Sequence, residues 1–463
     1  MATSLQQFVA EQAIKQIADF IADPVEAADF PKHHLRFRND RAALEIGLSG
    51  LNDSAWIAHF GKFEPLSGSL PQPLALRYHG HQFRVYNSDI GDGRGFLFAQ
   101  CRDAQGRLMD LGTKGSGQTP YSRFGDGRLT LKGAVREILA TEMLEALGVK
   151  TSRTLSVIET GESLNRGDEP SPTRSAVLVR LNHGHIRIGS FQRLASLGLT
   201  DELSRLAEYS LKYYFGETAG ADGPVRLLTL VAQRAAKMAA SYMAAGFVHG
   251  VLNSDNINIT GESFDYGPWR FTPTFDAKFT AAYFDQAGLY SFGRQAEAVY
   301  WNVVQLGNAL RCIADPDMLS AAIAPFEATY RAALVERMLW RLALKSRGDE
   351  ADLALIQAME AGLSESRTSI DDFFFDWQGG RIRREAVQYD HPAFDTFRNL
   401  VAVYATNPPA EHPYWAGAMP CSMLIDEVEN IWKPIAEQDD WTALTAKIAS
   451  IRRMGDALRL ANY

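Results

Sequence analysis

Hydrophobic and polar positions follow two different patterns along the chain, and the pattern changes near Gln192. Between residues 83 and 192, short apolar runs separated by glycine turns are typical of β-strands. These runs are residues 83–87, 95–103, 107–115, 154–162 and 175–181. In the same part, residues 131–148 place apolar side chains at helical spacing and stop at Gly148, which predicts one prominent helix.

Beyond Gln192 the apolar positions recur at helical spacing. Residues 226–246 are almost apolar all round and stop at Gly246, which predicts a long buried helix. Residues 298–313 and 318–339 continue the helical pattern. Between these helices, residues 247–268 break the period, and the pattern there predicts two short strands, which are residues 256–259 and 263–265.

The pattern predicts an α+β protein in two lobes, preceded by an extension. Residues 1–82 begin with an amphipathic helical pattern and continue irregularly, so they are predicted to be an N-terminal extension packed on the rest. Residues 83–192 are predicted to form a small lobe rich in β-strands with one prominent helix. Residues 193–463 are predicted to form a larger helical lobe that includes a divergent C-terminal region.

Composition narrows the possible partners. Hydrophobic residues make up 46% of the 463 residues, charged residues 22%, and the net charge is −8. Because phosphate neutralisation needs a basic face, an acidic chain without a run of Lys or Arg is not expected to bind nucleic acid. No apolar run of about 18 residues occurs, so no membrane span is expected. The three cysteines form no CxxC pair and suit a reducing compartment, and we expect a cytoplasmic protein.

A glycine-rich turn between the first two predicted strands is the first candidate for chemistry. Gly91, Gly93 and Arg94 follow one another in the run Asp-Ile-Gly-Asp-Gly-Arg-Gly. Glycines let backbone amides approach phosphate oxygens, and an arginine adds charge-assisted hydrogen bonds. The alternative is a β-hairpin whose turn simply uses glycine.

Lys114 lies at the end of a predicted strand about twenty residues further on. In kinases, such a lysine contacts nucleotide phosphates and pairs with a glutamate on the next helix. Glu137 is the first candidate for that partner and Glu142 the second. The alternative is a surface ion pair of little energetic value. The order of glycine turn, strand lysine and helix glutamate favours a nucleotide site.

The segment that follows the long buried helix carries the strongest signal. Kinases place a metal-binding Asn at the end of the His-Arg-Asp-Leu-x-x-x-Asn loop and a metal-binding Asp in a nearby Asp-x-Gly turn. Aligned on this pattern, His249 matches the His, Asn256 the Asn and Asp265 the second Asp. Val251 stands where the catalytic Asp belongs, and valine cannot accept a proton. Asp255 is the nearby carboxylate that could replace it, whereas the alternative for the segment is an Asx-rich turn.

Arg180 and Arg187 lie seven residues apart, and a bent strand or turn could bring both to one phosphate site. The alternative is ordinary salt bridges. Two His-x-His pairs, at residues 79–81 and 183–185, have the spacing of zinc ligands, but no third ligand is apparent. Neither a Gly-x-Ser-x-Gly nor a His-Glu-x-x-His motif occurs, so the sequence gives little support to a hydrolase.

Several long motifs resemble the selenoprotein O family, also called the YdiU family. They are YHGHQF, IGDGRGFLFAQ, LGTKGSGQTPYSRFGDGR, VREILATEML and FVHGVLNSDNINITGESFDYGP. The resemblance covers residues 75–310 and weakens after about residue 380. One departure is Arg84, which follows His81-Gln82-Phe83 where glycine is common in the family.

The resemblance implies a protein-kinase-like fold that uses ATP and Mg to transfer AMP to Ser, Thr or Tyr hydroxyls of protein substrates. In that family the nucleotide is reversed relative to kinases, so that its α-phosphate faces the acceptor. Carried over by motif, Asp255 is the proton acceptor, and Asn256 and Asp265 are the metal ligands. The implied nucleotide contacts are Gly91, Gly93, Arg94, Lys114, Asp126, Gly127, Arg180 and Arg187.

The sequence therefore predicts a protein adenylyltransferase in which Glu137 orients Lys114. Three alternatives stay open: transfer of UMP from UTP with Mn, conventional γ-phosphoryl transfer, and an inactive pseudokinase scaffold. The missing aspartate at Val251 motivates the scaffold, whereas the retained lysine, glutamate and metal-binding pair argue against it.

Overall fold

The structure is a computed structural model that describes residues 7–167, 169–384, 387–404 and 411–462. Its main element is an antiparallel nine-stranded sheet in the order β2-β4-β7-β8-β11-β10-β3, with β1 paired to β7 and β9 to β11. The strands are β1 Val9–Glu11, β2 Ala22–Pro24, β3 His34–Arg38, β4 Leu74–Leu76, β7 Leu97–Arg102, β8 Leu108–Lys114, β9 Leu129–Thr130, β10 Arg153–Leu164 and β11 Thr173–Asn182.

Two small hairpins accompany this sheet. They are β5 Gly80–Gln82 with β6 Val85–Asn87, and β12 Phe247–His249 with β13 Trp269–Phe271. The strands predicted between residues 83 and 192 are confirmed as β6, β7, β8, β10 and β11. Strands β8 and β11 are buried on both faces. Helix α4 covers one face of the sheet there, and the segment of residues 25–66 covers the other.

Helices lie on both sides of the sheet, α4 on one face and α2 and α3 on the other, and the later helices form the rest of the molecule. They are α1 Ala18–Ile21, α2 Asp40–Glu45, α3 Asp53–Phe60, α4 Leu131–Ala146, α5 Ile188–Ser196, α6 Thr200–Ser210, α7 Gly223–Ala245, α8 Gln295–Leu310, α9 Pro316–Ile323, α10 Phe326–Leu342, α11 Asp349–Ser366, α12 Ile370–Asp376, α13 Asp395–Val401, α14 Ile425–Gln438 and α15 Thr442–Ala461. The predicted helix 131–148 is confirmed as α4, and the predicted buried helix is confirmed as α7, which ends at Gly246 in a left-handed conformation.

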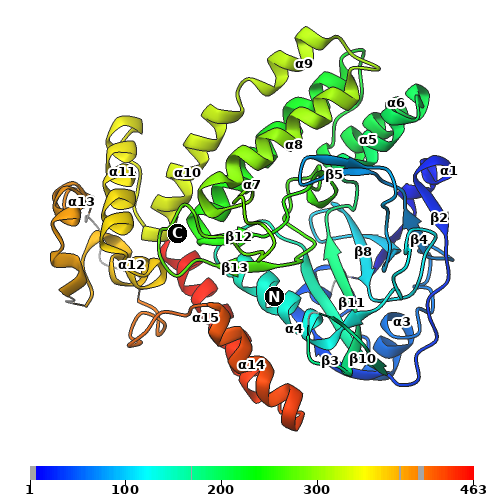
Figure 1. The fold of residues 1–463 in the computed structure, drawn as a ribbon, viewed down its shortest axis with the longest axis horizontal. Coiled ribbons are helices and arrows are strands. Elements are labelled where there is room, and N and C mark those ends of the chain that lie inside the picture. Colours follow the sequence, from blue (N-terminus) through cyan, green and yellow to red (C-terminus); the bar gives the residue numbers. More distant parts are fainter. Residues whose placement is uncertain (1–6, 168, 385–386, 405–410, 463) are drawn as a thin grey trace.

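Figure 1 shows the sheet on one side of the molecule and the long helices α7, α8, α9 and α10 on the other. The chain is thus a mixed α/β protein whose strands are concentrated before residue 192 and whose helices dominate after it. The C-terminal helices return to the sheet, because Arg452 of α15 forms an ion pair of 2.6 Å with Glu142 of α4. Lys132 of α4 likewise pairs with Glu429 of α14 at 2.7 Å, so α4 is held at two positions along its length.

Two predictions about secondary structure are wrong. The amphipathic pattern at the start does not give a leading helix over residues 7–24, where β1, a 3-10 turn, the four-residue α1 and β2 follow one another; residues 1–6 lie outside the described part. Pairing of β1 and β2 with sheet strands competes successfully with helix formation there. Residues 256–265 also form no strands and make only isolated bridges, such as Arg187 to Asn258.

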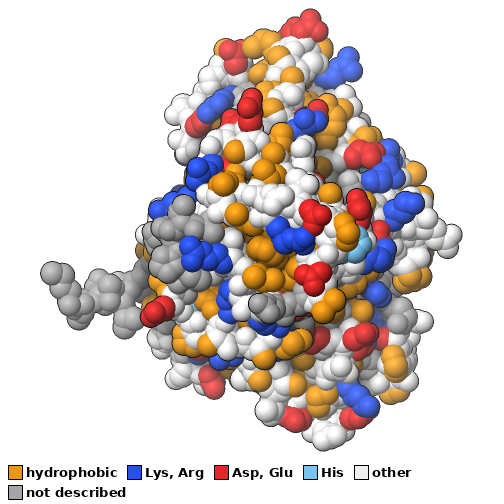
Figure 2. Space-filling view, turned by 90° about the vertical axis from the view of Figure 1, so that its left-hand side faces the viewer, with side chains coloured by type: hydrophobic (Ala, Val, Ile, Leu, Met, Phe, Trp, Pro, Cys, Tyr) orange, Lys and Arg blue, Asp and Glu red, His pale blue; other side chains and the backbone are white. Residues whose placement is uncertain are grey.

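The predicted extension, residues 1–82, contributes β1, β2, β3 and β4 to the same sheet as the predicted small lobe. On the face shown in Figure 2, Lys and Arg side chains alternate with Asp and Glu side chains and leave no continuous basic surface. Within the described residues, no helix combines the length and the apolar character that crossing a bilayer requires.

Candidate active site

Two neighbouring strands and one helix bring the first three candidate residues together. In the antiparallel register, Arg180 of β11 lies opposite Gly112 of β8, so Arg180 and Lys114 point to the same face of the sheet. On that face, Nζ of Lys114 lies 2.7 Å from a carboxylate oxygen of Glu137 on α4, and both side chains are buried. Arg180 lies 3.9 Å from the other oxygen of Glu137. Glu142, the second candidate partner, instead accepts from Arg452.

Asp265 lies at the centre of a cation cage, which consists of Lys114, Arg180 and Arg187. Its carboxylate oxygens lie 3.1 Å from Lys114, 3.6 Å from Arg180 and 3.7 Å from Arg187. Burial alone would raise the pKa of Asp265, but the cage holds this pKa well below its usual value. Its φ of 60° is unusual for a residue with a side chain and aims the carboxylate at the cage.

Arg187 connects the cage to the glycine turn and to the loop that follows α7. It precedes α5, is almost fully buried and stacks over the ring of Tyr78 at 4.2 Å. Its guanidinium pairs with Asp92 at 3.1 Å and donates to the backbone carbonyl of Asp255 at 3.3 Å. Nη2 of Arg187 thus contacts Asp92, whereas Nη1 contacts both the carbonyl of Asp255 and the carboxylate of Asp265.

A cavity of about 560 Å³ opens beside the cage. It is lined by Gly91, Gly93 and Arg94, so the glycine turn faces a cavity and is not the tip of a hairpin: β6 pairs with β5, and β7 pairs with other strands. A side chain at position 91 would collide with the ring of Tyr121 at 2.4 Å, which explains why glycine is required there. We call this space the main cavity.

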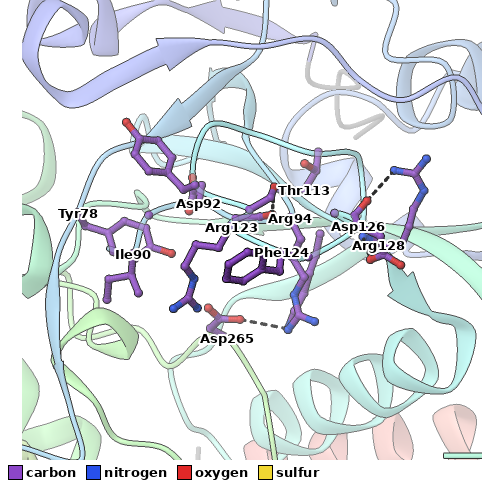
Figure 3. Close-up of a pocket in the computed structure, with 18 of the residues that line it drawn as sticks. Tyr78, Ile90, Asp92, Arg94, Thr113, Arg123, Phe124, Asp126, Arg128 and Asp265 are labelled. Carbon is purple, nitrogen blue, oxygen red and sulfur yellow. Dashed lines mark hydrogen bonds and ion pairs between the residues drawn. The ribbon is translucent and has the colours of Figure 1, made fainter. Parts of the chain in front are cut away.

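The second Gly-Asp-Gly-Arg run lines the opposite end of the main cavity, as Figure 3 shows for Asp126 and Arg128 relative to Asp265. Gly127 has φ of 71° and packs against the backbone of Gly117, so no side chain fits there. Asp126 is half exposed and forms an ion pair of 2.8 Å with Arg166, which keeps its pKa below the usual value against the raising effect of burial.

The loop after α7 carries Asp255 and Asn256. A short 3-10 turn, Ser254–Asn256, holds both residues, and His249 anchors the loop by contacting the backbone oxygen of Phe264 at 3.2 Å. The side-chain amide nitrogen of Asn256 donates to the carbonyl of Val251 at 2.9 Å. The amide oxygen of Asn256 accepts no hydrogen bond from the described residues and is therefore available to a ligand.

Asp255 lies in an environment opposite to that of Asp265. Its side chain is buried, and burial raises its pKa to about 6, although Arg187 opposes that shift. One carboxylate oxygen has no hydrogen-bond partner among the described residues, and the other accepts a long hydrogen bond of 3.4 Å from Gln82. The loop is covered by the β5–β6 hairpin, whose Gly80 approaches Asp255 so closely that a side chain there would touch it at 3.0 Å.

The structure thus brings most of the predicted residues together. Lys114, Arg180, Arg187 and Asp265 line the main cavity with both glycine turns, whereas Glu137 lies behind Lys114, and Asp255 and Asn256 lie outside the lining. Sequence reasoning missed several lining residues, which are Tyr78, Asp92, Arg123, Phe124, Arg128 and Arg166. The repeated Gly-Asp-Gly-Arg run indicates Asp92 and Arg128, but nothing local in the sequence indicates Arg166.

The donor atoms near the cage suit a hard cation. The Asp265 side chain is 23% exposed and lines the main cavity. The amide oxygen of Asn256 accepts no hydrogen bond from the described residues. Carboxylate and amide oxygens are the ligands that Mg²⁺ prefers, usually completed by phosphates and water. Among the described residues, no group of three or more His, Cys, Asp and Glu side chains is arranged to hold a metal.

The four histidines of the His-x-His pairs have other partners. His79 contacts Tyr86, and His81 contacts Gln192. His183 contacts the carbonyl of Leu108, and His185 contacts Asp110. Each of the four histidine rings therefore has a hydrogen-bond partner within the protein, as is usual for histidines in a core or loop.

Comparisons with known proteins give relatives that match nearly the whole chain. Residues 4–401 match the family model described as "Protein adenylyltransferase SelO". A protein of Synechocystis sp. named "Protein nucleotidyltransferase YdiU" is 42% identical over 93% of this chain and 95% of its own length. Proteins of the same name from Synechococcus elongatus (41% identical, 96% and 95%) and Gloeobacter violaceus (42% identical, 97% and 96%) are similarly close.

Proposed function

Since the chain belongs to the SelO family and is a protein nucleotidyltransferase, we propose that it transfers AMP from ATP to Ser, Thr or Tyr hydroxyls of proteins. The observation that carries this proposal is the position of Arg187. It contacts the metal-site candidate Asp265 at 3.7 Å and the backbone of the base candidate Asp255 at 3.3 Å. A nucleotide phosphate held by the cage would therefore lie beside a carboxylate able to accept a proton.

We propose a kinase-like fold for the same reasons. A sheet with one prominent helix is followed by a helical part, and the Lys114–Glu137 pair joins the sheet to that helix. The histidine before the loop contacts the residue before Asp265, as expected for coupled catalytic and metal-binding loops. The lobe boundaries at residues 82 and 192 stay predictions.

In the proposed reaction, the acceptor oxygen attacks the α-phosphorus of ATP, the bond to the β-phosphate oxygen breaks, and pyrophosphate leaves. The acceptor proton passes to Asp255, whose pKa of about 6 keeps it mostly ionised at neutral pH and still basic enough to take the proton. Lys114, Arg180 and Arg187 offset the charge that develops on the phosphate oxygens. Glu137 fixes the direction of Lys114 through the 2.7 Å ion pair.

Asn256 and Asp265 are the residues that would hold Mg or Mn in this proposal. When bound, the ion supplies charge neutralisation for the triphosphate. The cage cations already surround Asp265. A nucleotide phosphate that enters the main cavity would therefore replace the Asp265 carboxylate as an anionic partner of Lys114. The glycine turn at Gly91 and Gly93 leaves room for backbone amides to approach the phosphates.

Labelled nucleotides test the proposal and its alternatives in one experiment. Purified protein is incubated with a cell lysate and with ATP labelled at the α- or the γ-phosphate, or with labelled UTP and Mn. AMP transfer predicts protein label from α-labelled ATP alone and no label with Asp265→Ala. Label from γ-labelled ATP would instead indicate a kinase, label from UTP would indicate UMP transfer, and nucleotide binding without any label would indicate a scaffold.

We place the reaction in the cytoplasm, consistent with three free cysteines.

A further inference from the structure

A second concave site lies at the other end of β8 from the main cavity. It has a volume of about 390 Å³, within the range of small-molecule sites. Arg107, just before β8, lines it, whereas Lys114, the last residue of β8, lines the main cavity. At about 3.4 Å per residue, Arg107 and Lys114 are about 24 Å apart along the strand. We call this second site the basic pocket.

The lining of the basic pocket is strongly cationic. It includes five cations, Arg102, Arg107, Lys150, Lys212 and Arg234, and a single carboxylate, Glu262. Two of the cations are neutralised by carboxylates that do not line the pocket, because Arg102 pairs with Glu11 and Arg107 pairs with Asp103. Lys150, Lys212 and Arg234 form no ion pair with any described residue. The pocket therefore has more positive charge than its surroundings neutralise.

The unpaired cations repel one another. Partial burial lowers the pKa of Lys150, and the nearby Arg234 and Arg107 lower it further against the opposing effect of Glu262, which shows that these charges are close. Arg234 is fixed over the ring of Phe215 at 4.1 Å and donates to the carbonyl of Thr260 at 3.4 Å. Like charges collected in a concave site lose stability unless an anion enters between them. An anionic ligand is the species that would relieve this repulsion.

Glu262 relieves this repulsion only in part: it raises the pKa of Lys150, but the pKa stays below its usual value. Its carboxylate accepts a hydrogen bond of 2.7 Å from the backbone amide of His183, which directs it to the loop after β11. The pocket also presents aromatic side chains, Tyr213 and Phe215, beside the cations. Cations and aromatic faces together suit a phosphate group carried by a flat or small organic molecule.

We propose that the basic pocket is a second anion site that binds a phosphate-bearing small molecule. The site is separate from the main cavity, and the proposal does not depend on the reaction proposed above. Its walls nonetheless belong to the segments that carry the main site. Thr260 lies between Asn256 and Asp265, and His183 lies between Arg180 and Arg187.

Calorimetry with inorganic tripolyphosphate tests this proposal. The main cavity is first saturated with a non-hydrolysable ATP analogue and Mg, so that any further heat of binding reports another site. We expect one additional site in the wild-type protein, and an affinity at least about tenfold weaker in the double variant Lys150→Ala/Lys212→Ala. Both lysines are exposed, so the variant is expected to fold. Arg234→Ala serves as a second, independent variant.

A matched control removes two exposed lysines elsewhere. Lys345→Ala/Lys433→Ala changes the net charge equally, and neither residue lines the basic pocket. The proposal requires that this control binds tripolyphosphate like the wild type, that the Lys150→Ala/Lys212→Ala variant melts at a temperature no lower than the wild type, and that binding of the ATP analogue is unchanged in all variants. Absence of a second site, or equal weakening in the control and pocket variants, would overturn it.

A second arm distinguishes the source of the phosphate. ADP replaces tripolyphosphate under the same conditions. Tighter binding of ADP that is lost in Lys150→Ala/Lys212→Ala supports the site and assigns a nucleotide to it, whereas tighter binding of tripolyphosphate supports the site and assigns an inorganic chain. If the nucleotidyl transfer proposed above fails while this binding persists, the anion site stands alone.

Discussion

Asp255 and Asp265 lie ten residues apart on one connected segment, yet their surroundings shift the pKa values of the two carboxyl groups in opposite directions. Three cations surround Asp265 and hold its pKa well below the usual value. Asp255 faces burial with a single opposing arginine, and its pKa rises to about 6. Two identical side chains thus acquire different properties from their environment: one stays ionised, as the proposed cation ligand must, and the other can exchange a proton.

The two regions also differ in how they are supported. Two of the three cage residues, Lys114 and Arg180, lie on paired strands beside α4, which α14 and α15 hold through ion pairs at Lys132 and Glu142. The loop of Asp255 rests on a 3-10 turn covered by the β5–β6 hairpin, where Ser254 accepts a hydrogen bond from the backbone of His81. Most of the cage is therefore built into the sheet, whereas the loop of Asp255 depends on contacts between segments distant in sequence.

Replacement of the proposed base is expected to have the largest effect. Asp255→Ala removes the proton acceptor, so AMP transfer should fall by about 10²- to 10⁴-fold while binding of the ATP analogue stays close to wild type. Transfer is measured with α-labelled ATP, and binding by calorimetry. Transfer near the wild-type rate would contradict the assignment of Asp255.

A change on the cage side is expected to alter a different property. Lys114→Met leaves Glu137 buried without its partner, so the variant should lose about 3–5 kcal/mol of stability as well as nucleotide affinity. Unfolding by urea measures the first effect, and calorimetry the second. The control Lys114→Met/Glu137→Gln should recover part of the stability but none of the affinity. If the double variant is no more stable than Lys114→Met, the buried pair is not the cause.

The pH dependence separates the two aspartates without mutation. Transfer should fall about tenfold per pH unit below pH 6, because Asp255 must be ionised to accept a proton. Asp265, with its lowered pKa, should add no inflection above pH 4. The raised pKa of Asp255 also means that the folded chain keeps a proton which the unfolded chain loses between pH 3.8 and about 6. This group therefore contributes less to stability as the pH rises through that window.

The smallest expected effect concerns Gln82, the neighbour of Asp255. Its hydrogen bond to the carboxylate lowers the pKa of Asp255 slightly, so Gln82→Ala should move the acidic inflection of the rate profile to higher pH with a rate loss of only a fewfold at pH 8. A pH–rate profile of the variant checks this, with Gln192→Ala as a control that removes contacts with His81 and Ser254 but no hydrogen bond to the Asp255 carboxylate. An unchanged inflection would show that Gln82 does not tune the base.

The local pattern predicted the elements that carry the cage. Strands β8 and β11 and helix α4 have regular apolar spacing, and Gly246 marks the end of α7 where the sequence predicts it. Prediction failed where backbone pairing was decided by distant segments. Residues 7–24 joined the sheet edge instead of forming a helix, and residues 256–265 became a loop because their partners lie at positions such as Arg187.

The sequence by itself determined which side chains are available: a lysine, a glutamate, two arginines and an Asp-Asn and Asp-x-Gly pair in the order typical of kinases. It did not determine that Glu137 rather than Glu142 meets Lys114, nor that Asp265 lies among three cations while Asp255 is buried with one. Only the tertiary structure decides these points. Charge and burial depend on which distant residues surround a group, and spacing along the chain does not record that.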